Sequence, residues 1–471
     1  MIADSKIASR KVLLRNSKGQ YEVFPAIIEI DNAYIKKVTL LEETHYLQKI
    51  STEKELCVQN KVPFKDYGER LISPSFINAH THIPMNFFKP ILEMEKKAKN
   101  LVEDVFFKSE KIIKNEDIYA FAKIGAYENL LNGCGLIWDH YYAGLDIAKA
   151  CHEVGLAAVV APTIQDIFGP GAHRSEEAFE DTHTIQNHAE FKKKGVFAAL
   201  GPHATDTVSS TLWERIREHS VSWNLPVHVH VAQHPMEAAR IKEREGCSPI
   251  EYLQRLGILG DTPHNVLVHC IHTSAKDLRL IPKHTNTLIF CPFSQIIFDR
   301  PADITLWQAA SKEWAVATDT VASNDSMNVQ KELRFCASFP NLKKAFHKKE
   351  STLTSPLQDG IFFDSDFLLD KVFYTPGKMH PQFKAGVIEE KALANFIVWD
   401  INHPSFWPPF RLQRSLCMGD TTGAIYNMCV AGNWLGTDGN FYNNILQSKE
   451  YQESIKEANK RLQYLLQRLH P

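Results

Sequence analysis

Residues 225–233 read LPVHVHVAQ, a short apolar run in which histidines alternate with valines. Such a run predicts a buried β-strand, because residues two apart in an extended chain face the same side. A helix-like segment follows at 236–257, and a second apolar run, NVLVHCIHT, comes next at 265–273. This strand–helix–strand order is typical of parallel strands joined by helical crossovers.

Six further apolar runs extend the pattern in both directions. They are LISPSFINAH (71–80), GLIWDHYY (135–142), LAAVVAPTI (156–164), VFAALGPHA (196–204), NTLIFCPFS (286–294) and WAVATDTVA (314–322). Helix-like segments such as 116–133 and 210–224 separate them. Eight strand–helix units in series predict an α/β fold, a (β/α)8 TIM-like barrel over residues 73–371. An open doubly wound sheet is the alternative, but no GxGxxG follows the first strand.

The two ends of the chain predict a smaller β unit. Apolar alternation broken by turn-prone residues marks residues 11–72, and residues 371–434 look similar. The strand-rich stretches at both ends suggest that the termini meet. We therefore expect residues 1–72 and 372–445 to form one small β-sandwich domain from two segments.

Residues 446–471 have the pattern of an amphipathic helix. Its apolar face carries Ile455, Leu462, Leu465 and Leu469. We expect this helix to pack on the barrel or on a second copy of the chain. The polar stretch at 343–364 predicts an exposed loop or the edge of a lid.

Composition limits the classes of function. The 471 residues carry a net charge of -2, which argues against nucleic acid or an anionic membrane surface as a partner. We therefore expect a small-molecule substrate. Nine cysteines without a CxxC pair indicate reduced thiols. With no apolar run of roughly 18 residues and no leader-like N-terminus, a cytoplasmic protein is expected.

Histidines and an aspartate stand at the ends of the predicted strands. His80 and His82, in FINAHTH, lie two apart, so both face the same side of an extended chain. His230 ends the fifth strand, His269 the sixth, and Asp319 follows the apolar run of the eighth. Chemistry in a barrel gathers at the carboxyl ends of the strands, so these side chains are expected to converge. Imidazole nitrogens and a carboxylate oxygen suit Zn²⁺ or a similar cation, with one position open for water.

Two other histidines belong to the same strands. His228 lies one alternation below His230 and is interpreted as a hydrogen-bonded barrel histidine rather than a ligand. His140 ends GLIWDH and is placed at the rim, where it is a candidate for substrate contact.

The motifs resemble those of the amidohydrolase superfamily, in the branch of methylthioadenosine/S-adenosylhomocysteine deaminases, guanine deaminases and triazine (chloro)hydrolases. The matching blocks are ISPSFINAHTHIPM, GPHATDTVSS, LPVHVHVAQ, VLVHCIHTS, CPFS and ATDTVASNDSMN, and they cover most of residues 70–335. The resemblance implies a hydrolase acting on C–N bonds other than peptide bonds, one divalent metal ion per chain and a homodimer. Zinc is the favoured metal, with iron as the alternative.

Residue by residue, the resemblance assigns the metal to His80, His82, His230 and Asp319. Asp319 would also accept a proton from the nucleophilic water. His269 would orient or polarise that water, and His203, in GPH, would hydrogen-bond the substrate. No lysine ends the fourth strand, where two-metal members carry a carboxylated lysine, so a single metal is expected.

Two further matches concern the substrate. Glu110, in VFFKSEK, falls close to the position of a ribose-binding glutamate in adenosine-type deaminases, allowing one inserted residue. Arg174, in GAHRSEEA, falls where some members have an arginine that receives a substrate carboxylate. Both residues also fit as solvated charges at helix starts, and this alternative stays open.

The main departure from the family lies at the end of the fifth strand. Deaminases of this branch read His-x-x-Glu there, and the glutamate moves a proton from water to the substrate. This chain has Gln233 at that catalytic position. A primary amide cannot act as a general acid or base near pH 7.

Three interpretations therefore remain open. Proton transfer through Asp319 and His269 would preserve deaminase chemistry on a purine-nucleoside-like or other nitrogen-rich cyclic molecule. A substrate with a good leaving group, as in a chlorohydrolase or another amidohydrolase, or a substrate that is already protonated, would need no proton delivery. A metal-binding pseudoenzyme of the same fold is the third.

Overall fold

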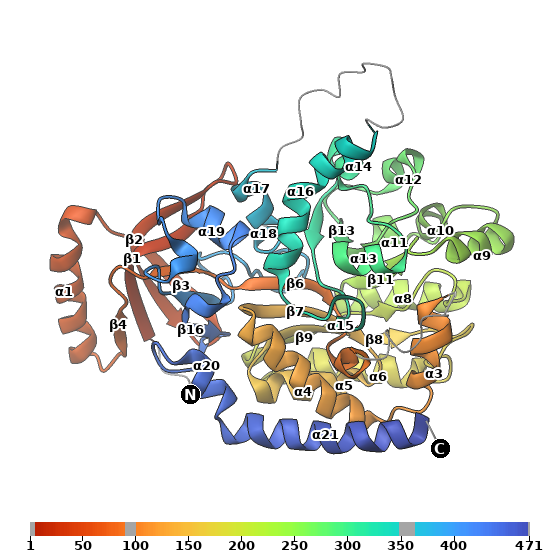
Figure 1. The fold of residues 1–471 in the computed structure, drawn as a ribbon, viewed down its shortest axis with the longest axis horizontal. Coiled ribbons are helices and arrows are strands. Elements are labelled where there is room, and N and C mark those ends of the chain that lie inside the picture. The colour runs from red at the N-terminus through yellow and green to blue at the C-terminus, as the bar shows by residue number, and fades with distance from the viewer. Residues whose placement is uncertain (1–4, 90–99, 348–362, 470–471) are drawn as a thin grey trace.

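The computed structural model describes residues 5–89, 100–347 and 363–469 (Figure 1). The strands of these residues form three sheets: a mixed sheet of eight strands and two parallel sheets of five and four strands. The parallel sheets and their helices make up the larger body, and the mixed sheet lies at one side of it (Figure 1).

The parallel sheets contain the predicted strands of the middle of the chain. The first consists of β6 (Phe76–Thr81), β7 (Cys134–Tyr141), β8 (Ala157–Ile164), β9 (Val196–Ala198) and β10 (Gly201–Pro202). The second consists of β11 (Val227–Val231), β12 (Asn265–His269), β13 (Asn286–Phe290) and β14 (Trp314–Val316). Every residue of β7 and β8 is buried, as expected for parallel strands covered on both faces.

Isolated parallel bridges join the two sheets on both sides. The bridged pairs are Leu200–Val227, Ala204–His230 and Thr81–Asp319. The α/β character and the order of the predicted strands are therefore confirmed, but the continuous ladders form two sheets and not one closed barrel. On one side, the pairing between the two parallel sheets is interrupted where the fourth predicted strand splits into β9 and β10. On the other side, it is interrupted after β14, where the backbone of Asp319 has a φ of 60°.

Helices follow the parallel strands and return the chain to the start of the next strand. They are α4 (Asn115–Leu131), α5 (Gly144–Val154), α6 (Ser175–Asn187), α7 (Ala189–Lys193), α8 (Ser210–Trp223), α9 (Pro235–Glu245), α10 (Pro249–Arg255), α11 (Ile258–Asp261), α12 (Ala275–Leu280), α13 (Pro292–Phe298), α14 (Ile304–Ala309), α15 (Val321–Asn324) and α16 (Val329–His347). Between β6 and α4 lie η2 (Ile83–Phe88), η3 (Val102–Phe106) and α3 (Phe107–Glu110). All parallel strands consequently present their carboxyl ends on one side.

The mixed sheet combines strands from both ends of the chain. Its members are β1 (Ser5–Arg15), β2 (Tyr21–Asp31), β3 (Tyr34–Leu40), β4 (Phe64–Asp66), β5 (Leu71–Pro74), β15 (Phe396–Trp399), β16 (Ile425–Val430) and β17 (Asn433–Trp434). β5 pairs with β1 on one side and with β15 on the other, which joins the two segments. The strands belong to one paired sheet, so a sandwich of two sheets is not confirmed.

Two features differ from the sequence-based expectation. The first predicted strand, residues 71–80, breaks at Ser75 into β5 and β6, which belong to different sheets. The segment 11–72 also contains a helix, α1 (Tyr46–Gln59), where only strands were expected. Tyr46 and Ile50, one helical turn apart, are buried against the sheet, and tertiary packing of this face stabilises the helix.

The remaining helices pack around these sheets. They are η1 (Glu43–His45), α17 (Ser365–Asp370), α18 (Tyr374–Gly377), η4 (Pro404–Phe406), α19 (Leu412–Met418), η5 (Thr422–Ala424), α20 (Phe441–Leu446) and α21 (Lys449–Leu469). The predicted C-terminal helix is α21, which runs along α4 (Figure 1), and Arg468 forms an ion pair with the buried Asp117 of α4. The predicted polar loop begins as the end of α16, and residues 348–362 lie outside the described residues. Among the described residues, no helix has both the length and the apolar character needed to cross a membrane.

Candidate metal centre and active site

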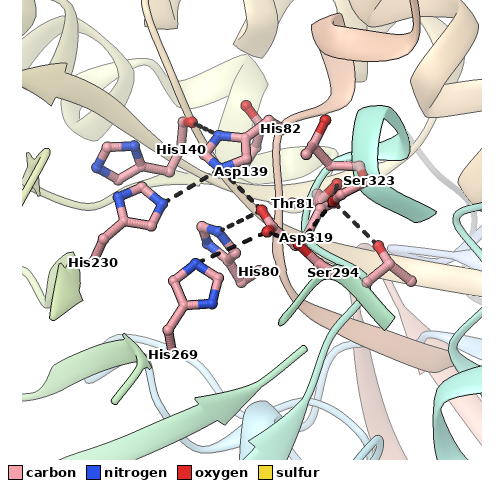
Figure 2. A network of polar contacts seen from close by, with 12 residues as sticks. His80, Thr81, His82, Asp139, His140, His230, His269, Ser294, Asp319 and Ser323 are labelled. Carbon is pink, nitrogen blue, oxygen red and sulfur yellow. Dashed lines mark hydrogen bonds and ion pairs between the residues drawn. The ribbon is translucent and has the colours of Figure 1, made fainter. Parts of the chain in front are cut away.

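Five of the predicted side chains converge at the carboxyl ends of the parallel strands (Figure 2). The Nε2 atoms of His80 and His82 lie 3.3 and 3.2 Å from Asp319 Oδ1. His230 Nε2 lies 3.4 Å from His82 Nε2. His269 Nε2 lies 3.9 Å from Asp319 Oδ2. Residues from β6, β11, β12 and the turn after β14 therefore share one centre.

A second contact fixes each of three imidazole rings. The pairs are His80 Nδ1 with His228 Nε2 at 2.8 Å, His82 Nδ1 with the His140 carbonyl, and His230 Nδ1 with the His203 carbonyl at 2.6 Å. Because Nδ1 is engaged, Nε2 of each ring is directed toward the centre, an arrangement typical of metal-binding histidines. The interpretation of His228 as a hydrogen-bonded histidine is confirmed.

Asp319 is held by hydroxyl groups that sequence reasoning did not identify. Ser294 Oγ donates to Asp319 Oδ2 at 2.5 Å, and Ser323 Oγ donates to Ser294 Oγ at 2.7 Å. Thr81 Oγ1 donates to the Asp319 carbonyl at 3.0 Å, and the Asp319 N–H donates to the His80 carbonyl at 3.1 Å. The carboxylate is therefore oriented with Oδ1 toward His80 and His82.

Burial and hydrogen bonding set the protonation states of the cluster. Burial lowers the pKa of His80 to about 4 and that of His269 to about 3, and it holds the pKa of His230 well below its usual value. Burial opposes ionisation of Asp319, but the imidazoles of His80 and His82, whose Nε2 atoms lie 3.3 and 3.2 Å from Oδ1, hold the pKa of this carboxyl well below its ordinary range. Burial would lower the pKa of His82, but its contact with Asp319 outweighs this and raises that pKa. Neutral imidazoles at His80, His230 and His269 beside an ionised carboxylate are the protonation states in which these groups bind a cation.

The chemistry of the donor set fits a divalent metal. Within the described part of the chain, the buried Nε2 atoms of His80 and His269 have no hydrogen-bond partner. Two trios have their donor atoms within 4.8 Å of one another: His80 with His82 and His230, and His80 with His269 and Asp319. Buried nitrogen and oxygen donors of this kind suit zinc or a similar cation.

A cavity of about 60 Å³ lies over these side chains. Its lining includes Glu110, His140, His203 and Gln233, all of which were candidates from the sequence. Glu110, at the end of α3, is buried, and this burial raises the pKa of its carboxyl to about 7. The structure therefore brings Glu110 to the cavity despite its distance along the chain from the metal motifs.

Two of the histidines that line the cavity, His140 and His203, differ in their remaining hydrogen-bonding capacity. His140 Nε2 lies 3.3 Å from the Pro202 carbonyl, and its Nδ1 lies 3.3 Å from Thr163 Oγ1. Because both ring nitrogens are engaged, His140 offers a ring surface rather than a polar contact. His203 uses Nδ1 to contact Thr207 Oγ1 at 3.3 Å, which leaves Nε2 for a ligand.

The structure does not bring Arg174 to the cavity. Its Nε and Nη2 atoms donate to Glu177 at 2.8 and 2.7 Å, and Nη2 also donates to Asn115 Oδ1 at 2.7 Å. A carboxylate three residues ahead on α6 is the nearest partner for this guanidinium. The arrangement matches the alternative of a charge at a helix start.

Gln233 lies in the turn between β11 and α9. Its backbone N–H donates to Glu237 Oε2 at 2.9 Å, and the preceding N–H, of Ala232, donates to Glu237 Oε1 at 3.0 Å. Glu237 therefore fixes the turn that presents Gln233 to the cavity. Sequence reasoning missed Glu237, because a glutamate in a helix carries no signal of such a role.

Other unpredicted residues had weak signals. Ser294 and Ser323 lie within the motif blocks CPFS and ATDTVASNDSMN, but the sequence alone assigned no role to either of them. Asp139, next to His140, accepts a hydrogen bond from the Ile83 N–H at 2.6 Å and so fixes the chain just after His82.

An α/β scaffold with imidazole and carboxylate donors at its strand ends is typical of hydrolases that use a divalent metal. Residues 71–435 match the amidohydrolase family, and the chain belongs to this family. It is accordingly a hydrolase acting on C–N bonds other than peptide bonds.

Curated relatives include deaminases of adenosine-type compounds. The chain is 24% identical to a 5'-deoxyadenosine deaminase of Methanocaldococcus jannaschii over 420 residues, which cover 88% of this chain and 94% of the relative. It is 28% identical to a 5-methylthioadenosine/S-adenosylhomocysteine deaminase of Pyrococcus abyssi over 373 residues, covering 78% and 82%.

Solved structures share the fold. An adenosine deaminase from Xanthomonas campestris with bound zinc has a TM-score of 0.79 at 18% identity, covering 99% of both chains. An atrazine chlorohydrolase from Arthrobacter aurescens, complexed with zinc, has a TM-score of 0.76 at 16% identity, covering 97% of this chain and 100% of that one. The fold is therefore TIM-barrel-like, and structures that share it hold zinc.

Proposed function

We propose that this chain is a metal-dependent deaminase of a purine-nucleoside-like or other nitrogen-rich cyclic small molecule, with one zinc ion per chain. The convergence of His80, His82, His230 and Asp319 beneath a small cavity carries the proposal. The relatives that are deaminases of adenosine-type compounds support the substrate class.

The proposal includes the architecture around the site. We take residues 73–371 as a (β/α)8 barrel interrupted at two ladders, with residues 1–72 and 372–445 as a β-sandwich-type domain and 446–471 as a terminal helix. The isolated bridges on both sides of the parallel sheets support the first part. The sharing of one sheet by both ends of the chain supports the second.

The chain's own residues have distinct roles in this reaction. A divalent metal, when bound, supplies Lewis acidity and lowers the pKa of a coordinated water. Asp319 accepts a proton from the attacking water, and Ser294 keeps the carboxylate oriented for that transfer. His269 is neutral at pH 7, because burial lowers its pKa to about 3, so it orients the water as a hydrogen-bond partner and does not act as an acid.

Gln233 changes how the leaving group receives its proton. Its amide can orient a substrate nitrogen through hydrogen bonds but cannot transfer a proton. Asp319 is the group that must return to the substrate the proton it took from water. We therefore expect a slower deaminase than one with a carboxyl at this position, because general acid–base groups contribute roughly 10²–10⁴-fold.

The same residue favours a second candidate function. A substrate whose leaving group departs as a stable anion, such as chloride, needs no proton at this point. Hydrolysis of a chlorinated nitrogen heterocycle would then use the same metal ligands, with Gln233 as a neutral hydrogen-bonding group.

Product release across a substrate panel tests the proposal. Zinc-loaded protein is incubated with 5'-deoxyadenosine, 5'-methylthioadenosine, guanine, cytosine and a chlorotriazine, and ammonia and chloride are measured. We expect ammonia from an adenosine-type compound. Chloride without ammonia would favour the second candidate, and neither product at full metal content would contradict both and favour a binding role.

A further inference from the structure

The cavity over the metal ligands is too small for a nucleoside. About 60 Å³ accommodates only a few waters, whereas pockets for drug-sized ligands are roughly 300–1,000 Å³. A second cavity of about 170 Å³ shares Val102, Phe107, His203 and Gln233 with the first. A nucleoside-sized substrate whose reacting carbon lies at the metal centre would therefore have to extend past Gln233 toward this second cavity, which we call the annex.

Carboxyl groups outnumber cationic groups in the annex. Its described lining includes Glu103 of η3, Asp206 in the turn after β10, and Glu237 of α9, against the single guanidinium of Arg240. Arg240 Nη1 contacts Glu103 at 2.7 Å and Asp206 at 3.0 Å, and its guanidinium lies 4.8 Å from the centre of the Phe168 ring. The guanidinium is thus already engaged by two carboxylates and offsets only one of them.

Among the described residues that line the annex, Arg240 carries the only guanidinium or ammonium group beside these buried carboxyl groups. Asp206 and Glu237 are 6% and 5% exposed. Burial, followed by the charge of Asp206, raises the pKa of Glu237 to about 7. Burial also raises the pKa of Asp206, although its hydrogen bond with Arg240 acts in the opposite direction. A cation bound nearby would favour the ionised form of both carboxyl groups.

Gln233 stands at the junction of the two cavities. The carboxyl of Glu237 already accepts its backbone N–H, so a glutamate side chain at position 233 would add another negative charge beside two buried carboxyl groups. A neutral amide separates the metal centre from the annex without that repulsion.

From this geometry we propose that the annex receives a cationic substituent, an ammonium or amidinium group, on the part of the substrate remote from the scissile bond. Asp206 and Glu103 accept its hydrogen bonds, and the ring faces of Phe107 and Phe168 cover its alkyl part. This inference rests on the proposed function, because it places the reacting ring at the metal centre.

Three matched compounds test the proposal on the zinc-loaded full chain. They are 5'-amino-5'-deoxyadenosine, which is protonated at neutral pH, the neutral 5'-deoxyadenosine, and adenosine-5'-carboxylate. Binding by calorimetry and kcat/KM for ammonia release are both measured. We expect the amino compound to be favoured over the neutral one by at least about tenfold, a preference of about 1.4 kcal/mol, and the carboxylate to be the poorest.

Two variants and a control connect the preference to the annex. Asp206→Asn and, independently, Glu103→Gln should each reduce the ratio of kcat/KM for the amino compound to kcat/KM for the neutral compound. Glu243→Gln, an exposed acid on the same helix as Glu237, should leave the preference intact.

The outcomes separate this inference from the proposed function. Ammonia release without preference for the amino compound, or preference for the carboxylate, overturns the annex and leaves the deaminase intact. Tighter binding of the amino compound without ammonia release supports the annex and contradicts the deaminase. If none of the three compounds binds, both are wrong.

Discussion

The floor of the active site and its wall are built in different ways. The floor consists of His80, His82, His230, His269 and Asp319, which lie on strands or directly after them. The wall, represented by Glu110 and Gln233, comes from a short helix and from a turn fixed by a helical glutamate. Under the proposed function, the floor would determine which reaction is possible, and the wall would determine which molecule reacts and how quickly its leaving group departs.

The largest effect is expected from a substitution in the floor of the active site. Asp319→Asn keeps the shape of the side chain but removes the proton acceptor, so turnover should fall by about 10²–10⁴-fold. Ammonia release from a substrate that the wild type accepts measures this. Asp325→Asn is the matched control, since Asp325 is exposed and has a positive φ of 56° that asparagine tolerates. Equal turnover in the two variants would remove Asp319 from the chemistry.

The second-largest effect is expected at His228, which supports a histidine of the floor. His228→Ala removes the partner of His80 Nδ1, so zinc affinity should fall by about 10–100-fold. Competition with a chromogenic chelator measures that affinity. His264→Ala serves as the control, because His264 is also a buried histidine but binds Thr287 outside the site. If His228→Ala binds zinc as tightly as this control, the ring orientation does not depend on His228.

A change in the wall should act on turnover and spare the metal. Gln233→Glu restores a proton-transfer group, and we expect about a tenfold gain or more in ammonia release, limited by repulsion from Glu237. Zinc content should not change. Gln254→Glu, at an exposed position of α10, controls for the added charge. No gain on any substrate that the wild type deaminates would show that Gln233 does not limit proton transfer.

The smallest expected effect concerns pH. Burial raises the pKa of Glu110 to about 7, so its carboxylate forms only as pH rises through that value. We expect this carboxylate to accept hydrogen bonds from substrate hydroxyls, as the resemblance to adenosine-type deaminases implies. KM of the wild type should therefore fall several-fold between pH 6 and 8, as hydrogen bonds to a charged acceptor form. Glu110→Gln should have a higher KM at pH 8 and no such slope. If KM depends on pH in the same way in both proteins, Glu110 is not the cause of that dependence.

Glu110 should also make the free energy of unfolding depend on pH. Rising pH should weaken folding while it improves substrate binding. Because the pKa of Glu110 in the folded state exceeds its ordinary value of 4.5, folding binds a proton, and the free energy of unfolding falls as pH rises from about 4.5 to about 7. Glu110→Gln should flatten this part of the stability curve, which denaturant titration at several pH values would measure.

Much of the floor could be predicted from the sequence. The two-residue spacing of His80 and His82 places both rings on one side of a strand, and apolar runs before His269 and Asp319 mark buried strand ends. Local periodicity was sufficient because strands fix side-chain direction. It did not predict the split at Ser75, where one apolar run serves two sheets, nor α1, which forms by packing against β1 and β2.

The wall could be predicted only in part. Glu110 was found by resemblance, but Arg174 pairs with Glu177 instead of the cavity, since a neighbouring carboxylate on the same helix is closer. The hydroxyl chain from Ser323 through Ser294 and the role of Glu237 depend on contacts between segments far apart in the sequence. Such contacts arise from tertiary packing and leave no periodic pattern.

Metal analysis tests the central site most directly. Elemental analysis of purified wild-type protein and of His80→Ala, each loaded with zinc and dialysed, gives the metal content per chain. We expect about one zinc per chain in the wild type and less than about a tenth of that in the variant, because His80 belongs to both donor trios. Equal zinc content in the two proteins, or two zinc ions per wild-type chain, would contradict a single centre built on His80, His82, His230 and Asp319.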